Sequence, residues 1–327
     1  MNVRSLSLAL VLAAAATVTA CDGGGDSGNG GSGGSGASGG DGGSGATGAT
    51  GGSGGSGAAG GGEDCPTQAS GTAANHIIIT VTWPETIGLN AGEGEMHVWT
   101  KANLTFDGND VSGTAEPCGS IIPALTKTDL AGGGQVQTQI PDEVWDAAGM
   151  PTFDVKGSIS GFGVGATISM DPIASTVGLT MTDPMNDPWP ASPQQIEAVD
   201  HDGDGSPGIK AIPRTDAPFS APPLSLQGAL DPNGPRADEV HVVTRTIIQL
   251  AGTRDSCTSA KGTATVDAVD SHVVGCHVKD GGVCTQDESN FIDSNQPKFT
   301  IKSAKYEMKQ VPANATCADV RAALPAE

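Results

Sequence analysis

The chain has 327 residues, of which 37% are hydrophobic and only 3% aromatic, and a formal net charge of −21. This acidity argues against nucleic acid or an anionic lipid surface as a partner, because both recruit proteins through basic patches. The acidity mainly indicates solubility.

Residues 1–20 have the layout of a secretory signal peptide, with a short basic start, an apolar run and small residues at the end. The apolar run is shorter than the ~20 residues that a bilayer-spanning helix needs. Residues 18–21 read Val-Thr-Ala-Cys and resemble the lipobox of bacterial lipoproteins. The resemblance implies cleavage before Cys21 and attachment of lipid to its sulfur. The alternative is an ordinary signal peptide that a cysteine follows by coincidence.

Lipidation of Cys21 would anchor the protein in the cell envelope, and we expect it at the outer membrane or cell surface. Residues 21–63 then form the lipidated cysteine and a tether made almost entirely of Gly, Ser, Ala, Thr and Asp. Such a composition has no apolar surface to offset the entropy of ordering, so we expect disorder. A flexible coil of this length has a reach of roughly 35 Å, which predicts a spacer between membrane and domain.

Six further cysteines follow the tether. An even number of cysteines in an exported domain predicts three disulfides, although six cysteines allow about fifteen pairings. The alternative is a metal site, but no Cys-x₂-Cys pair occurs in the chain. The expected disulfide cysteines are Cys65, Cys118, Cys257, Cys276, Cys284 and Cys317.

A repeat divides the domain into two related β units, at residues 64–199 and 216–327. Residues 95–101, Glu-Met-His-Val-Trp-Thr-Lys, return 144 residues later as Glu-Val-His-Val-Val-Thr-Arg at 239–245. In both copies apolar residues alternate with polar ones at period two, which predicts a long half-buried antiparallel strand. The alternation predicts that Met96 and its even-numbered successors point inward, and that His97 and Trp99 point outward.

Further runs of alternating residues predict more strands, separated by Asp-Gly, Asn-Gly and Gly-Gly turns. Helix is expected only at residues 142–148 and 316–323. Many strands and little helix predict an all-β antiparallel barrel or sandwich, and whether the two units share one barrel stays open. The expected strands lie at 76–82, 152–159, 164–170, 177–181, 263–269, 272–278 and 298–310.

Residues 200–215 form an Asp-rich connecting loop and contain the best candidate metal site. Asp200, Asp202 and Asp204 stand at positions 1, 3 and 5, a glycine follows, and the carbonyl of Ser206 supplies a further oxygen. Ca²⁺ takes six to eight hard oxygen ligands, and this spacing lets the three carboxylates converge on one ion. The segment resembles the first half of EF-hand, dockerin and thrombospondin-type calcium loops.

The loop departs from the EF-hand at Ala211, where a bidentate Glu would close the cage. A carboxylate from elsewhere must then complete the site, with Asp216 or Asp187 as candidates. Weak, structural calcium binding is the expectation, and the alternative is an acidic turn that binds nothing.

No catalytic residue is expected. None of the serines of the domain lies in a nucleophile elbow, and no His-Glu-x-x-His or P-loop motif occurs. Paired carboxylates for glycoside hydrolysis need only spatial proximity, so a hydrolase stays an alternative. His97 and His241 recur in the repeat and are interpreted as surface or interface histidines, with ligands of a metal at a seam between the two units as the alternative. The lysines between 298 and 309 predict a solvated strand face, and the alternative is a surface that meets an acidic glycan or a partner.

The combination of lipobox, Gly/Ser tether and Asp-rich loop resembles surface lipoproteins of the myxobacterial type, a resemblance that carries no active site with it. It implies a location in the cell envelope and says nothing of mechanism. The sequence as a whole predicts a lipid-anchored envelope protein with a non-enzymatic binding or structural β domain. Its expected partners are the membrane, through the anchor, and an envelope polysaccharide, hydrophobic ligand or protein. The alternative is an envelope hydrolase acting on a glycan or ester. A barrel with an apolar lumen would favour ligand carriage, and a filled core would favour a structural role.

Overall fold

The computed structural model describes residues 65–67, 69–86, 88–128, 133–216, 224–225, 236–279 and 281–326. The expected signal peptide, Cys21 and the tether lie outside these residues. In the described part of the chain, no helix combines the length and apolar character needed to span a membrane.

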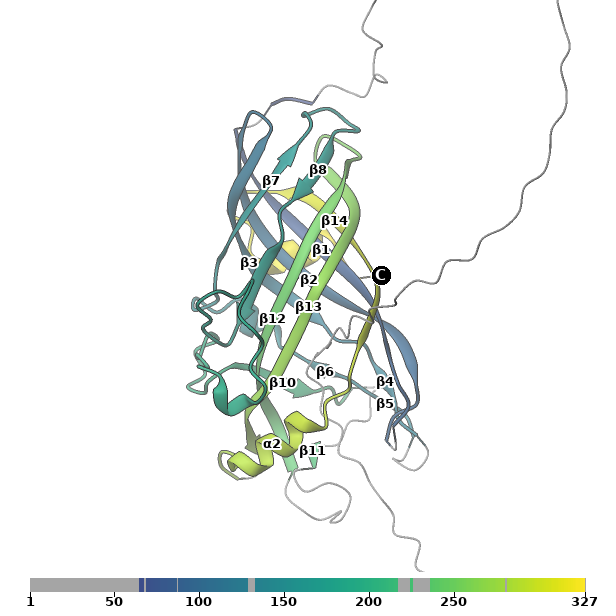
Figure 1. Ribbon diagram of the computed structural model, residues 1–327, viewed down its shortest axis with the longest axis vertical. Helices are drawn as coiled ribbons and strands as arrows, with labels where there is room; N and C mark the ends of the chain where they lie inside the picture. Colours follow the sequence, from purple (N-terminus) through teal and green to yellow (C-terminus); the bar gives the residue numbers. More distant parts are fainter. Residues whose placement is uncertain are drawn as a thin grey trace, which may run out of the picture. The chain divides into compact units, whose positions relative to one another are not determined.

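Eight antiparallel strands form one closed ring, so the domain is a barrel (Figure 1). The order around the ring is β1, β2, β3, β7, β8, β12, β13 and β14, and β14 returns to pair with β1. The strands are β1 Ser70–Trp83, β2 Gly92–Asp107, β3 Asp110–Ile121, β7 Phe153–Ile159, β8 Thr167–Met170, β12 Arg236–Arg254, β13 Ser259–Val278 and β14 Thr300–Val311. The all-β prediction is confirmed.

Short strands complete the wall between β3 and β12. At one end of the barrel β7 and β8 join these two long strands, and at the other end β6 and β10 do so. Strand β9 pairs with β12 between them. The short strands are β4 Leu125–Thr126, β5 Gln135–Val136, β6 Thr138–Gln139, β9 Ile173–Val177, β10 Ile209–Pro213 and β11 Leu224–Ser225.

Three short helices and a 3₁₀ turn, Pro193–Gln195, supply the described helical structure: α1 Asp142–Trp145, α2 Gln286–Ser294 and α3 Cys317–Ala323. The two helices expected from the sequence are confirmed as α1 and α3. Helix α2 was not expected, although its capping box, in which Thr285 and Glu288 bond each other's backbone N–H, is readable in the sequence. The buried Ile292 of α2 packs beside Val273 of β13.

The two copies of the repeat are β2 and β12, each of which turns back into a hairpin partner. In each partner strand a Gly-Thr-Ala begins with a glycine at which a side chain would collide with the neighbouring backbone. Gly113 faces the carbonyl of Asn103 in this way, and Gly262 faces that of Ala251. The recurring glycine is therefore required by close approach of the strands.

The predicted inward face of the repeat lies in the barrel core. Met96 and Leu104 of β2 share one hydrophobic cluster with Ile248 and Leu250 of β12, so both units contribute to a single barrel. Trp99 faces outward as expected but is only 3% exposed, because α3 covers it. An outward position is therefore not always a solvated one.

Several expected boundaries differ from the structure, three of them in a way that changes the elements themselves. The strands expected at 263–269 and 272–278 form one continuous strand, β13. The strand expected at 177–181 is wrong, because β9 ends at Val177 and the N–H of Gly178 donates to Nδ1 of His201 instead of to a strand. The connecting loop 200–215 also contains a strand, β10.

The three expected disulfides are confirmed, and the structure decides their pairing. Cys65 pairs with Cys257, Cys118 with Cys317, and Cys276 with Cys284. The first two bonds join residues 192 and 199 positions apart in the sequence, and the third closes a hairpin-sized loop of separation 8.

Candidate functional site

The Asp-rich loop is a tight turn between the end of the first unit and β10. Asp200 holds the turn, because its two carboxylate oxygens accept the N–H groups of Gly203 at 2.6 Å and Gly205 at 2.9 Å. Both glycines have positive φ, 76° and 91°, which glycine adopts without strain. Burial alone would raise the pKa of Asp200, but the N–H donors of Gly205 and Gly203 outweigh it and hold that pKa below its usual range.

The structure brings the three predicted aspartates together. One carboxylate oxygen each from Asp200, Asp202 and Asp204 lies within 4.8 Å of the others. Ser206 lies next to them, and its N–H donates to Oδ1 of Asp204 at 2.8 Å.

Asp202 is the least satisfied member of this group. Its Oδ2 accepts the N–H of Lys210 at 2.8 Å, whereas its Oδ1 is buried and has no hydrogen-bond partner among the described residues. Burial, with the charge of Asp204, raises the pKa of Asp202. An ionised carboxylate oxygen withdrawn from water without a partner is costly, and a cation would remove that cost.

Asp204 also connects the loop to the second copy of the repeat. Nε2 of His241 lies 2.9 Å from Oε1 of Glu239 and 3.7 Å from Oδ2 of Asp204. The carboxylates suggested for closing the cage are engaged elsewhere: Asp216 pairs with Arg214, and Asp187 accepts the N–H of Asp183. Glu239 is the carboxylate that the structure places beside Asp204.

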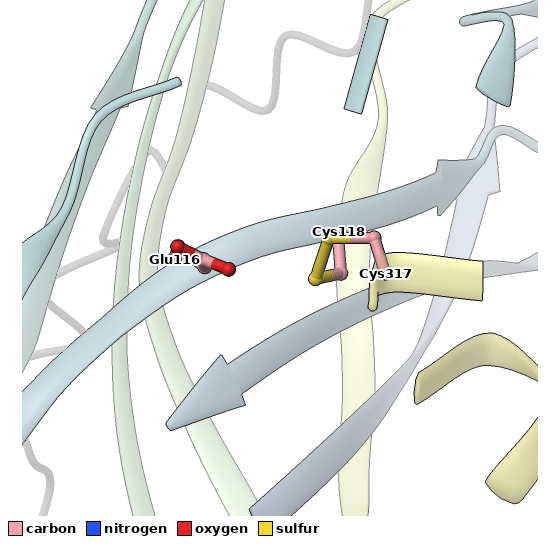
Figure 2. A group of neighbouring side chains, drawn as sticks. All are labelled: Glu116, Cys118 and Cys317. Atoms are coloured by element: carbon pink, nitrogen blue, oxygen red, sulfur yellow. A yellow bond between two sulfur atoms is a disulfide. The ribbon is translucent and has the colours of Figure 1, made fainter. Parts of the chain in front are cut away.

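A third group of potential ligand atoms does not qualify as a metal site. Figure 2 shows Glu116 beside Cys118 and Cys317, whose sulfur atoms are bonded to each other. Metals bind thiolates, which a disulfide does not supply. Glu116 is instead ion-paired with Lys101 at 2.5 Å.

An aspartate and histidine pair on β13 and α2 has the geometry of a catalytic base with its orienting acid. Nδ1 of His272 lies 3.0 Å from Asp293. However, its Nε2 lies 2.9 Å from the carbonyl oxygen of Pro190, and its ring stacks on Trp189. Both ring nitrogens are therefore engaged, and neither is directed at a nucleophile. This pair connects α2, and the loop segment that contains Trp189 and Pro190, to the barrel wall.

The interior of the barrel contains a row of three cavities with mostly apolar walls. Their volumes are about 90, 50 and 90 Å³. The first and second share Leu104, Met170 and Met308, and the second and third share Ser175 and Thr246. The lining residues place the first cavity at the β7 and β8 end of the barrel, with Ile159 and Met170, and the third toward the β10 end, with Ala211. Figure 1 shows these two ends of the barrel. We call this row the lumen.

A guanidinium group stands at the first end of the lumen. Arg254, the last residue of β12, lines the first cavity with Phe106 and Phe162. It donates to the carbonyls of Phe162, at 2.8 Å, and Cys257. In the described part of the chain no carboxylate forms an ion pair with it. The adjacent Asp255 is directed elsewhere, with its Oδ2 3.6 Å from Nζ of Lys261. Burial lowers the pKa of Arg254.

The lumen and Arg254 were not predicted from the sequence. A signal was present, because Arg254 continues the inward-facing even positions of β12 beyond Ile248 and Leu250. A cation at an inward position of a strand is unusual unless something pairs with it.

Comparison with known proteins identifies no matching family model, curated protein or solved structure.

Proposed function

We propose that this protein is a lipid-anchored protein of the cell envelope whose barrel binds a slender amphiphile, such as a fatty acid, and does not turn it over. The carboxylate would pair with Arg254, and the apolar chain would lie along the lumen. The observation that carries this proposal is an apolar row of cavities with a guanidinium at one end that pairs with no carboxylate of the described residues.

The chemistry of the lumen supports this choice of ligand over a polysaccharide. Leu104, Met170, Ile248 and similar side chains offer few partners for the many hydroxyl groups of a sugar, but bury a hydrocarbon chain favourably. Each buried CH₂ group contributes roughly 0.8 kcal/mol. A charge-assisted hydrogen bond to Arg254 would then fix the direction of the chain.

The site of chain entry supports the same proposal. Pro66 and Cys257 line the first cavity, and Cys65 is bonded to Cys257. Cys65, the first described residue, therefore lies at the end of the barrel that carries Arg254. A lipidated Cys21 would keep the protein close to membrane lipids, which are the richest source of such amphiphiles.

The test is a binding measurement on the full-length chain with Cys21→Ala, which removes the anchor and the need for detergent. We expect stearic acid to bind, and Arg254→Gln to weaken it about tenfold, since a hydrogen bond to a charged group contributes roughly 1.5–3 kcal/mol. Arg254→Gln should weaken the binding of stearyl alcohol much less, because stearyl alcohol has no charge. Calorimetric titration measures all four affinities.

Lys156→Gln is the matched control, because it removes one positive charge from an exposed position of β7. It should leave both affinities unchanged. Failure of the full-length Cys21→Ala chain with Arg254 intact to bind either compound, or hydrolysis of acyl esters by it, would contradict the proposed function.

We propose in addition that the Asp-rich loop binds Ca²⁺ as a structural ion, through Asp200, Asp202, Asp204 and the carbonyl of Ser206. Oδ1 of Asp202 supports this proposal, because it is buried and no described residue forms a hydrogen bond with it. The ion would stabilise the connection between the two β units and take no part in ligand binding, because these residues do not line the lumen.

A further inference from the structure

A polar side chain interrupts the apolar wall at the middle of the lumen. Asn75 of β1 is 5% exposed and follows the same inward row as Ala73, Ile77 and Ile79, which all belong to the barrel core. It lines the second cavity. An asparagine at such a position reduces the apolar surface that the barrel buries and therefore needs a compensating partner.

The structure supplies a hydrogen-bond partner for only one of the two polar atoms of the Asn75 amide. Nδ2 of Asn75 donates to Oγ1 of Thr100 at 3.3 Å, while Oδ1 is buried and has no partner within the described residues. Ser175 and Thr246 add two more hydroxyl groups to the same cavity. Asn75, Thr100, Ser175 and Thr246 thus all belong to the lining of one small, mostly apolar chamber, and one acceptor of Asn75 has no partner within the described residues.

We propose that Asn75 binds a hydroxyl group carried by the chain of the ligand, so that the lumen selects a hydroxylated fatty acid over an unsubstituted one. A hydroxyl group both donates and accepts, so it matches either edge of the amide. The inference rests on the proposed function and specifies its ligand class. A water molecule would also fit a cavity of about 50 Å³ and satisfy Oδ1, and the experiment below separates the two occupants.

The register of the strands places this hydroxyl group away from the carboxylate. Arg254 pairs with Ala260, Ala260 with Met308, and Met308 with Asn75. Neighbouring strands lie about 4.8 Å apart, so Asn75 is roughly 14 Å from Arg254 around the wall and closer across the lumen. A hydroxyl group near the middle of an eighteen-carbon chain would meet Asn75, and one beside the carboxylate would not.

The experiment compares stearic acid with its 2-, 8- and 10-hydroxy derivatives on the full-length Cys21→Ala chain. We expect the 8- or 10-hydroxy acid to bind about tenfold more tightly than stearic acid, because pairing a vacant buried acceptor is worth about that factor. The 2-hydroxy acid should bind like stearic acid. This arm needs no variant in the lumen.

Asn75→Leu should abolish the preference by weakening the hydroxy acid about tenfold and leaving stearic acid bound as tightly or more so. Asn103→Leu is the matched control, because Asn103 is exposed on β2 and lines none of the three cavities. It should keep the preference.

If stearic acid binds and all hydroxy acids bind with the same affinity as stearic acid, the inference is overturned. Asn75 then holds a water molecule, and the proposed function stands. The inference is overturned in the same way if the preference survives Asn75→Leu. If none of the four acids binds the domain, the proposed function itself fails.

Discussion

At the scale of single residues, Asp202 shows how burial creates a requirement for a partner. We expect millimolar Ca²⁺ to raise the midpoint of thermal unfolding by about 3–5 °C, which corresponds to about 1.4 kcal/mol at tenfold saturation. Asp202→Ala should remove this rise, while Asp171→Ala, at an exposed position, should keep it. Scanning calorimetry with and without EDTA measures the effect. An unchanged midpoint in the parent protein would make the loop an ordinary turn.

His76 shows a second consequence of burial at this scale. Its ring is 2% exposed, stacks on Trp99 with centroids 4.5 Å apart, and lies 2.9 Å from the ring of His97. Burial and the charges of His97 and Lys305 lower the pKa of His76 to about 4. Below pH 6.5 the unfolded chain therefore takes up a proton that the folded protein resists, so stability falls as the pH falls from 6.5 toward 4.

We predict that His76→Gln makes unfolding less sensitive to acid. Between pH 7 and pH 4.5 the free energy of unfolding of the parent should fall by roughly 2 kcal/mol more than that of the variant, as the size of the pKa shift implies. Urea titrations at the two pH values measure the difference. His277→Gln, at a half-exposed position, is the control and should behave like the parent. Equal losses in parent and His76→Gln would show that other groups dominate.

At the scale of elements, α3 is attached to the barrel by a disulfide and by packing. Cys317 is bonded to Cys118 of β3, and Val320 packs with Trp99, whose Nε1 donates to the carbonyl of Leu324 at 2.7 Å. The chain between the two cysteines is long, with a sequence separation of 199. The bond therefore restricts the unfolded state far more than the bond between Cys276 and Cys284 does.

Replacing both Cys118 and Cys317 by Ala should lower the free energy of unfolding by about 2 kcal/mol more than replacing both Cys276 and Cys284, because loop-closure entropy grows with loop length. Chemical denaturation of the two double variants measures this ranking. The short-loop pair serves as the matched control, since each double variant removes one bond and two buried or half-buried sulfurs. The reverse ranking would show that native packing outweighs loop closure.

At the scale of the whole molecule, the barrel and its tether have separate roles in the proposal. Labelled fatty acid should become covalently attached to the native protein and not to Cys21→Ala, because the thiol of Cys21 is the proposed acceptor. The label is followed on a denaturing gel after extraction of noncovalent lipid, which removes any acid held in the lumen. Arg254→Gln controls for that second pool and should label normally. Equal labelling of Cys21→Ala would contradict the anchor.

The sequence by itself determined the class of the fold, the outline of the long strands and the set of cysteines that bond. These follow from local patterns: alternation at period two around Met96 and Val240, turn residues between strands, and an even number of cysteines. It also identified the aspartates of the connecting loop, because their spacing is itself the signal. Strand ends were less accurate, since hydrogen bonds such as that of Gly178 to His201 depend on distant residues.

Only the tertiary structure decided the closure of both units into one barrel, the pairing of the disulfides and the existence of the lumen. Arg254 and Asn75 lie on strands far apart in the sequence, and their position along one interior depends on the register of three intervening strand pairs. The volume left between inward side chains depends on how all eight strands pack. Local patterns contain neither quantity, because each is set by contacts between residues that the chain brings together only when it folds.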